Sequence, residues 1–300
     1  MSEIRQSEET TVKVNEDIEI AYDTFGESLQ PPLLLVMGLG SQMIMWDEEF
    51  CKQIAAKGYW VIRFDNRDVG LSTKLNTLPV PDPMQLFQAL QQGKTIDVPY
   101  SLLDMAKDAV GLLNALKVKS AHIVGASMGG MIAQTIAIHF PERVRTLTSI
   151  MSTTGNPDLP LPQPEAQSIL IRRPPENREE YIEYSVQIWR ILNGPIMAFD
   201  EEFYRQRSAR IYDRNFYPAG TGRQLGAIMA AESRKKALKE VKIPTLVIHG
   251  DVDPLVPVEG GKDTAKAIPD AKLMIIEGMG HNIPVTIAPQ IIEAIASHTV

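Results

Sequence analysis

The sequence predicts an α/β fold in which helices cover both faces of a mostly parallel central sheet. Short apolar runs rich in Val and Ile alternate along the chain with longer segments that have the period of a helix. Continuous apolar strands of this kind are typical of a parallel sheet with both faces buried. One interval, residues 152–240, breaks the alternation. With 300 residues, 44% of them hydrophobic, the chain is long enough to form a large core.

The expected strands and helices follow from this alternation. Parallel strands are expected at residues 33–37, 60–65, 122–124, 144–151, 245–248 and 273–276. Helices are expected between them at residues 47–57, 102–116, 131–139, 260–267 and 289–298. Ser101 and Asp104 have the spacing of a capping box, which marks the start of the second helix. Residues 11–14 and 18–22 alternate in polarity around a tight turn, which predicts an antiparallel hairpin at one edge.

The interval 152–240 is interpreted as a helical cap, inserted into a core made of residues 1–151 and 241–300. The interval begins with many prolines, and helical patterns follow at residues 178–192, 200–213 and 221–239. Ligands bind at the carboxyl ends of parallel strands, so a cap placed there would cover the binding pocket. The alternative is a helical spacer without function. A connection at residues 73–100, with a short helix near 84–91, has no assigned role.

Composition and charge exclude several classes of partner. The formal net charge is −7, whereas nucleic-acid binding needs clustered Lys and Arg, so no nucleic-acid partner is expected. No apolar run is long enough to span a membrane, and no secretory signal is recognised. Cys51 is the single cysteine, which excludes an intramolecular disulfide and fits a reducing compartment. We therefore expect a soluble, cytoplasmic protein whose oligomeric state the sequence does not indicate.

The strongest signal for chemistry is the G-x-S-x-G pattern at residues 125–129. The pattern follows an expected strand and precedes a helix, which is the context in which it places a serine nucleophile on a sharp turn. Such a turn tolerates only very small neighbours, and Gly125, Ala126 and Gly129 supply them. Ser127 would lie at a helix N-terminus, where the helix dipole favours developing negative charge. The alternative is a glycine-rich turn with an incidental serine.

A serine needs a base to become a useful nucleophile, and five histidines are available. Four of them have simpler explanations as residues of strands or helix ends: His122, His139, His249 and His298. His281 follows a Gly-Met-Gly run in a loop between the last strand and the last helix, where packing gives no reason for a histidine. His281 is therefore predicted to be the base.

The base in turn needs a carboxylate that fixes its tautomer. Asp251 and Asp253 both follow the strand expected at 245–248. Asp253 is preferred, because Pro254 stiffens the turn and Gly250 lets the chain reach the loop tip. Asp251 is interpreted as a turn residue that binds its own backbone. The alternative is that both are plain turn residues.

Stabilisation of an oxyanion requires two backbone donors near the nucleophile. The N–H of Met128, the residue after the serine, is expected to be one, and the N–H of Leu39 in the glycine loop after residues 33–37 is the candidate for the other. An apolar substrate pocket is expected to be lined by Gly38, Trp189, Met197 and Phe199. For Trp189, Met197 and Phe199, the alternative is that they only pack the cap on the core.

No metal ion and no cofactor are expected. The sequence has no His-x-x-x-His pairing and no cysteine pair, and its aspartates are scattered. No G-x-G-x-x-G follows the first parallel strand in a form that would bind a dinucleotide.

These motifs together resemble the α/β-hydrolase superfamily over nearly the whole chain. Besides the nucleophile turn, residues 65–72 are similar to that family's D-x-R-x-x-G-x-S loop, and Asp253 and His281 correspond to its acid and base positions. Many members begin the oxyanion loop with His-Gly, where this chain has Met37-Gly38. That departure removes a histidine but keeps both backbone donors.

A narrower likeness is to the aclacinomycin methylesterase group, in residues 34–38, 61–65 and 189–192. The group removes a methyl ester from a polyketide antibiotic, so the resemblance implies hydrolysis of carboxylic esters. The expected apolar pocket predicts small-molecule substrates, namely esters of short to medium acyl chains or methyl esters. Specificity depends on the cap and the pocket rather than the fold, so the particular substrate is not carried over. A carbon–carbon bond hydrolase, a thioesterase or a perhydrolase could use the same three residues. A non-catalytic small-molecule receptor is a further alternative, although a receptor has no need of all three.

Overall fold

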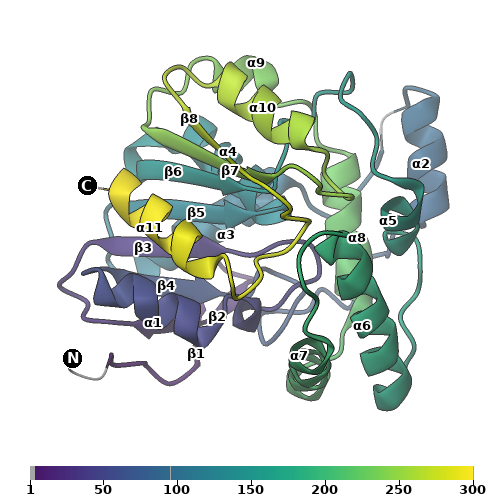
Figure 1. Ribbon diagram of the computed structural model, residues 1–300, viewed down its shortest axis with the longest axis horizontal. Coiled ribbons are helices and arrows are strands. Elements are labelled where there is room, and N and C mark those ends of the chain that lie inside the picture. The colour runs from purple at the N-terminus through teal and green to yellow at the C-terminus, as the bar shows by residue number, and fades with distance from the viewer. Residues whose placement is uncertain (1–3, 95, 300) are drawn as a thin grey trace.

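The computed structural model describes residues 4–94 and 96–299, and within them one eight-stranded sheet has the order β1-β2-β4-β3-β5-β6-β7-β8 (Figure 1). The strands are β1 (Thr10–Lys13), β2 (Glu19–Phe25), β3 (Pro32–Val36), β4 (Trp60–Phe64), β5 (Ala121–Ala126), β6 (Val144–Ile150), β7 (Thr245–Gly250) and β8 (Lys272–Ile276). Strands β3 to β8 pair in parallel, whereas β1 pairs with β2, and β2 with β4, in antiparallel fashion. The predicted mostly parallel sheet with a hairpin at one edge is confirmed.

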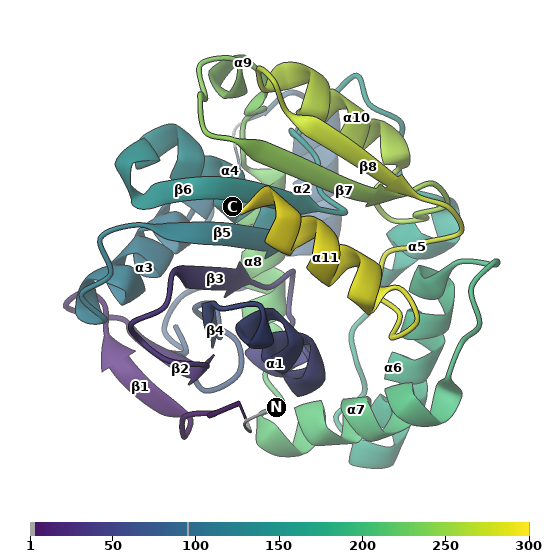
Figure 2. The ribbon, with the colours of Figure 1, turned by 60° about the vertical axis from the view of Figure 1, so that its left-hand side comes forward.

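The alternation of side chains along each strand explains the two layers of the core. Leu33 and Leu35 on β3 face one apolar cluster, and Leu34 and Val36 face the other, since successive strand residues point to opposite sides. The first cluster packs under α1 (Glu48–Ala56) and α11 (Ala288–His298), and the second packs under α3 (Leu102–Ala115), α4 (Met128–His139) and the end of α10 (Val258–Ala267). Figure 2 shows α1 and α11 in front of the sheet, with α3 and α4 behind it.

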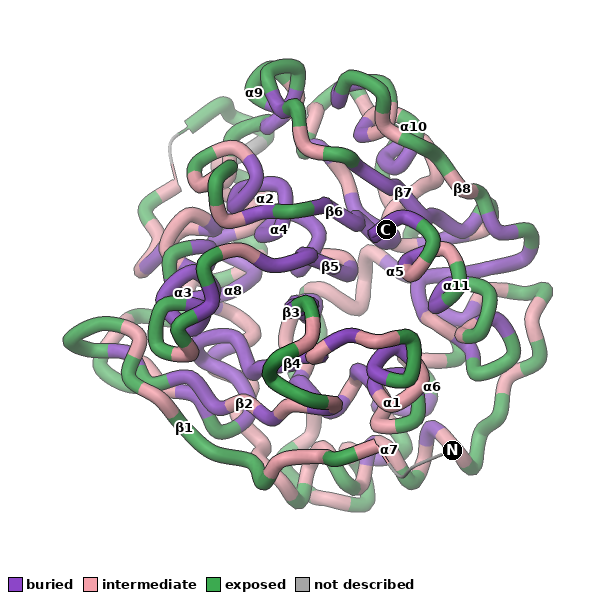
Figure 3. The backbone as a smooth tube through the Cα atoms, turned by 90° about the vertical axis from the view of Figure 1, so that its left-hand side faces the viewer, coloured by how far each residue is buried: buried purple, intermediate pink, exposed green. Residues whose placement is uncertain are grey.

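Burial falls from the centre of the sheet to its edges. Every residue of β3, β5 and β7 is buried, whereas β1 and most of β8 are exposed (Figure 3). Leu273 and Ile275, which the sequence places in a fully buried strand, remain 41% and 39% exposed. The reason is that β8 is an edge strand, and these two side chains point away from its buried face.

The interval 152–240 contains α5 (Pro164–Ile169), α6 (Arg178–Asn193), α7 (Glu201–Arg214), α8 (Pro218–Met229) and α9 (Lys235–Leu238). In Figure 1, α5 to α8 lie together on the right, beyond the carboxyl ends of the parallel strands. Helix α2 (Pro83–Gln91), from the connection 73–100, lies on the same side and packs on α8. Two short 3₁₀ turns complete the described elements, η1 (Met43–Met45) and η2 (Pro141–Arg143).

The largest differences from the predicted helices occur at three places. The single helix expected at 221–239 is wrong, because α8 ends at Met229 and the N–H of Arg234 donates to the Thr154 carbonyl instead of continuing the helix. The six-residue α5 was not expected in the proline-rich part. Helix α4 begins at Met128, three residues before the predicted start. The capping box of Ser101 and Asp104 at the start of α3 is confirmed.

No helix in the described ranges is both long and apolar enough to cross a membrane.

Candidate active site

Ser127 lies on the sharp turn between β5 and α4. Its backbone angles are φ 55° and ψ −121°, in a region that an L-residue enters only at a cost of about 1–3 kcal/mol. The neighbouring glycines are required by space. A Cβ on Gly125 would lie 2.1 Å from the Gly129 carbonyl oxygen, and a Cβ on Gly129 would lie 2.1 Å from that of Val36. The close passage of strand, turn and helix therefore holds the strained serine in place.

His281 and Asp253 complete a chain of hydrogen bonds to the serine. His281 Nε2 lies 2.9 Å from Ser127 Oγ, and His281 Nδ1 lies 2.7 Å from Asp253 Oδ2. A carboxylate only accepts, so Nδ1 carries the proton and Nε2 is left to accept from the serine hydroxyl. The sequence separates Asp253 from Ser127 by more than 120 residues, and the carboxyl ends of β5, β7 and β8 bring the three side chains together.

The other carboxylate oxygen of Asp253 is held by the turn in which the residue lies. Asp253 Oδ1 accepts hydrogen bonds from the backbone N–H groups of Leu255 (2.9 Å) and Val256 (2.8 Å). Burial by itself raises the pKa of Asp253, but the charge and hydrogen bonds of His281 and His249 outweigh it and lower the pKa to about 2. The carboxyl group therefore stays ionised at neutral pH. A histidine that gains a proton requires such a charged partner.

Asp251 has a role that differs from the predicted one. Its carboxylate accepts from the N–H of Gly278 at 2.7 Å, rather than from its own turn. Gly278 has a φ of 75° and precedes His281 by three residues. The prediction of a local turn bond is therefore wrong, because Asp251 joins the loop after β7 to the loop after β8, which carries His281.

The loop that carries His281 is also bound to the interval 152–240. The N–H of His281 donates to the Leu192 carbonyl at 2.7 Å, at the end of α6. Asn282 Nδ2 donates to Asn193 Oδ1 (2.8 Å) and to the Tyr204 hydroxyl (2.7 Å). Sequence reasoning missed Asn193, Asn282 and Tyr204, since nothing in a single sequence signals contacts between residues about 80 positions apart.

The two candidate oxyanion donors are the N–H groups of Met128 and Leu39. Met128 is the first residue of α4, where N–H groups have no partner within the helix, and its side chain is fully buried in the core. Gly38 packs directly on the nucleophile, because a Cβ there would lie 3.2 Å from Ser127 Cβ. In the described part of the chain, the N–H of the next residue, Leu39, has no hydrogen-bond partner. Gly40 N–H donates to Gln224 Oε1 at 2.8 Å, which anchors this loop to α8.

The three predicted pocket residues of the interval 152–240 make packing contacts. Trp189 and Phe199 both stack on Tyr204, with ring centroids 5.5 and 4.7 Å apart. Met197 is half-buried near Gly278, and its carbonyl accepts from Asn193 Nδ2 at 2.7 Å. Contact with a substrate remains a prediction for these residues.

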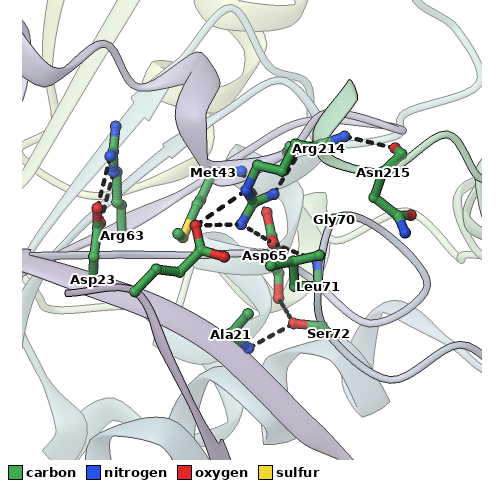
Figure 4. A network of polar contacts seen from close by, with 12 residues as sticks. Ala21, Asp23, Met43, Arg63, Asp65, Gly70, Leu71, Ser72, Arg214 and Asn215 are labelled. Carbon is green, nitrogen blue, oxygen red and sulfur yellow. Dashed lines mark hydrogen bonds and ion pairs between the residues drawn. The ribbon is translucent and has the colours of Figure 1, made fainter. Parts of the chain in front are cut away.

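The D-x-R-x-x-G-x-S loop is a buried polar network (Figure 4). The carboxylate of Asp65 accepts from the N–H of Met43 (2.6 Å), the N–H of Leu71 (2.8 Å) and the guanidinium of Arg214 (2.7 Å). A Cβ on Gly70 would lie 2.0 Å from Asp65 Oδ2, so glycine is needed there. The network fixes the segment that follows Leu39 and joins it to the end of α7.

A cavity of about 160 Å³ lies beside the loop that carries His281. Apolar side chains of α1, α7 and α11 supply much of its lining, and Ile283 and Val285 extend it to that loop. None of Ser127, Asp253 and His281 lines it, and His281 is only 6% exposed. His281 is therefore buried, whereas Ser127 is of intermediate exposure.

No group of three or more His, Cys, Asp and Glu side chains that could share a metal ion occurs among the described residues.

Comparison with known proteins defines the family. Residues 31–286 match the model of the alpha/beta hydrolase fold family, so the chain belongs to that family. The chain is 30% identical to the rhodomycin D methylesterase DauP of Streptomyces sp. (strain C5) and 29% identical to the rhodomycin D methylesterase DnrP of Streptomyces peucetius, in both cases over 97% of this chain and 98% of the relative. A crystal structure of a hydrolase from Pseudomonas aeruginosa PA01 superposes with a TM-score of 0.71 at 22% identity, covering 97% of each chain. The predicted fold and the resemblance to a methylesterase group are confirmed.

Proposed function

We propose that this protein is a serine carboxylesterase in which Ser127 is the nucleophile, His281 the base and Asp253 the acid. One observation carries the assignment: the hydrogen bonds from Ser127 to His281 and from His281 to Asp253 form an unbroken chain that begins on a strained nucleophile turn. The role of each residue fits its chemistry. The buried carboxylate of Asp253 orients the imidazole of His281, and that imidazole lies within hydrogen-bond distance of the Ser127 hydroxyl. The likeness to two methylesterases makes esters the class of substrate.

The first half-reaction forms an acyl-enzyme. His281 Nε2 takes the hydroxyl proton while Ser127 Oγ attacks the ester carbonyl carbon, and Asp253 stabilises the imidazolium that results. The tetrahedral oxyanion accepts hydrogen bonds from the N–H groups of Met128 and Leu39. When the intermediate collapses, the bond to the alkoxy oxygen breaks and His281 returns the proton to the leaving alcohol.

The second half-reaction hydrolyses the acyl-enzyme. Water enters in place of the alcohol, gives a proton to His281 and attacks the same carbonyl carbon. Ser127 Oγ then leaves and regains its proton, so that one ester and one water become one acid and one alcohol.

We further propose that residues 152–240 act as a cap that covers the substrate over a core of residues 1–151 and 241–300. Gly38, Trp189, Met197 and Phe199 would line the pocket on the side of the cap and the oxyanion loop. Such a cap would favour methyl esters or esters of short to medium acyl chains over lipid aggregates, because it would stand between the site and a lipid surface.

The experiment is hydrolysis of p-nitrophenyl acetate, butyrate and octanoate at pH 8 by the native protein and by Ser127→Ala. We expect Ser127→Ala to lose at least about 10³-fold in kcat, since the nucleophile of a triad cannot be replaced by its neighbours. Ser120→Ala is the matched control, since it removes a hydroxyl just before the other end of the same strand. Turnover that persists in Ser127→Ala would refute the assignment. Absence of turnover in the native protein would favour carbon–carbon, thioester or peracid chemistry on the same residues, or a receptor.

A further inference from the structure

His249 is a buried histidine for which the proposed mechanism has no use. It lies near the end of β7 with 0% exposure, four residues before Asp253. Its Nε2 is 2.8 Å from the Val256 carbonyl oxygen and 3.5 Å from Asp253 Oδ2. Its Nδ1 is buried and has no hydrogen-bond partner in the described part of the chain. A buried ring of this kind, next to the acid of a candidate triad, requires an explanation.

The contacts define which nitrogen carries the proton. The Val256 carbonyl can only accept, so the proton must be on Nε2. The arrangement therefore places an N–H of the ring at Nε2, where it points toward Val256 and Asp253.

Gly261 holds the ring in this position. A Cβ at residue 261 would lie 2.5 Å from His249 Nδ1, so α10 packs its backbone directly against the unpartnered nitrogen. The ring has no room to turn on that side. The close packing explains why the buried nitrogen has no partner.

The Nε2–H of His249 acts on the acid in two ways. The backbone N–H of Val256 donates to Asp253 Oδ1 at 2.8 Å, and the carbonyl of the same residue accepts from His249, so the ring closes the turn that holds the acid. The same N–H lies 3.5 Å from Oδ2, the oxygen that binds His281 at 2.7 Å. The positions of both carboxylate oxygens of Asp253 therefore depend on His249. Oδ1 depends on it through the turn that contains Val256, and Oδ2 through its attraction to the N–H of the ring.

We propose that His249 is a positioning residue, which fixes Asp253 so that Oδ2 stays directed at His281 Nδ1. The inference rests on the proposed function, because it concerns the acid of that same triad. Loss of the His249 N–H would free the Val256 peptide and let the carboxylate rotate, which misorients His281 in the transition state but leaves substrate binding unchanged.

The experiment compares three substitutions of His249 in the full-length protein, by steady-state hydrolysis of p-nitrophenyl butyrate. His249→Leu fills the space without a donor, His249→Gln places an amide N–H near the original Nε2, and His249→Asn has the same amide on a chain too short to reach Val256. We expect kcat to fall by about 10–100-fold in His249→Leu and His249→Asn, with KM within twofold of the native value. We expect His249→Gln to recover kcat to within about threefold of the native protein.

The control is His122→Leu, which removes the other buried strand histidine. His122 lies near the amino end of β5, at the end of the strand away from Ser127. His122 is 6% exposed and bonds Thr146 Oγ1 at 3.0 Å, so its replacement disturbs packing to a similar degree without touching the acid. A kcat in His249→Leu or His249→Asn within twofold of that of His122→Leu would overturn the proposal, as would a failure of His249→Gln to exceed His249→Asn. If His249→Leu does not fold, the comparison of His249→Gln with His249→Asn decides the matter.

Failure of the proposed function gives a different result. If Ser127→Ala and Asp253→Asn hydrolyse the ester as well as the native protein does, the triad itself is refuted. If both lose activity while His249→Asn and His249→Leu retain it, the triad stands and only the role of His249 is refuted.

Discussion

The two loops that flank Ser127 are both bound to the helices of residues 152–240, but by opposite kinds of chemistry. The loop that carries His281 is held by neutral groups, the Leu192 carbonyl and the side chains of Asn193 and Tyr204. The loop that carries Leu39 binds Gln224 of α8, and the D-x-R-x-x-G-x-S loop next to it is bound to α7 and α8 by charged side chains. Each loop supplies one requirement of the proposed mechanism, the base in the first case and an oxyanion donor in the second.

The charged side is a set of buried ion pairs around the D-x-R-x-x-G-x-S loop. Arg214 binds Asp65 at 2.7 Å, and Arg223 of α8 binds both carboxylate oxygens of Asp68 at 2.8 and 3.0 Å. Arg223 is 1% exposed and Asp68 is fully buried. Buried ion pairs cost free energy to form, because both charges lose their water. Removal of only one partner costs more, because the remaining buried charge has neither water nor an opposite charge beside it.

This difference has a consequence for what each side controls. Removal of one partner from a buried ion pair costs about 3–5 kcal/mol, whereas removal of one neutral hydrogen bond costs about 1 kcal/mol. We therefore infer that the charged side determines how firmly residues 152–240 are attached, and that the neutral side determines the precise position of the base. The first should be visible in stability, and the second in rate.

The largest effect is expected for Arg223→Met. The substitution keeps most of the volume but leaves Asp68 buried without its partner, so the free energy of unfolding should fall by about 3–5 kcal/mol. The measurement is urea unfolding followed by circular dichroism. The double variant Arg223→Met/Asp68→Asn is the control, because it removes both charges and should recover at least half of the loss. If the free energy of unfolding of Arg223→Met falls by less than about 1 kcal/mol, the inference that the charged side determines the attachment of residues 152–240 is wrong.

A second effect concerns Asp253, whose carboxylate binds His281 on the neutral side. Its pKa of about 2 in the folded protein lies below the ordinary value of about 3.9, so its contribution to stability is present above about pH 4 and is lost as the pH falls through 2. Asp253→Asn should therefore unfold about 2 kcal/mol more easily than the native protein from pH 7 to about 4.5, and the difference should shrink to about half by pH 3.

Urea unfolding of both proteins at several pH values between 3 and 7 tests this expectation. Asp158→Asn, which changes an exposed aspartate, controls for the loss of one charge. A difference that is constant down to pH 3, or that grows as the pH falls, would contradict the stabilising contact between Asp253 and the histidines.

Local patterns in the sequence predict the parts of the molecule whose causes are local. The strands, the hairpin edge and the capping box of Ser101 follow from periodicity and composition, and the small residues around Ser127 follow from the geometry of a single turn. Asp253 and His281 are found from their positions after expected strands, because the carboxyl ends of parallel strands meet at one edge. These features need no knowledge of which distant helix covers them.

Features that depend on distant contacts were not predicted. Helix α8 ends where Arg234 turns to bind Thr154, and Asp251 reaches Gly278 across two loops. His249 has the same pattern around it as an ordinary strand residue, and only the packing of Gly261 shows that its ring is fixed beside the acid. In each case the tertiary fold determines which residue is the partner, so periodicity and spacing within the chain do not predict it.

The smallest effect is expected on the neutral side, for Tyr204→Phe. The substitution keeps the ring that stacks on Trp189 and Phe199 but removes the hydroxyl that accepts from Asn282, the residue after the base. We expect a loss of about 1 kcal/mol in the free energy of unfolding and a two- to fivefold fall in kcat with little change in KM. Tyr212→Phe is the matched control, since it also lies on α7 and loses one hydrogen bond, from its hydroxyl to the Glu176 carbonyl. Equal kcat values in the two variants would show that the hydroxyl of Tyr204 only stabilises α7 and does not position His281.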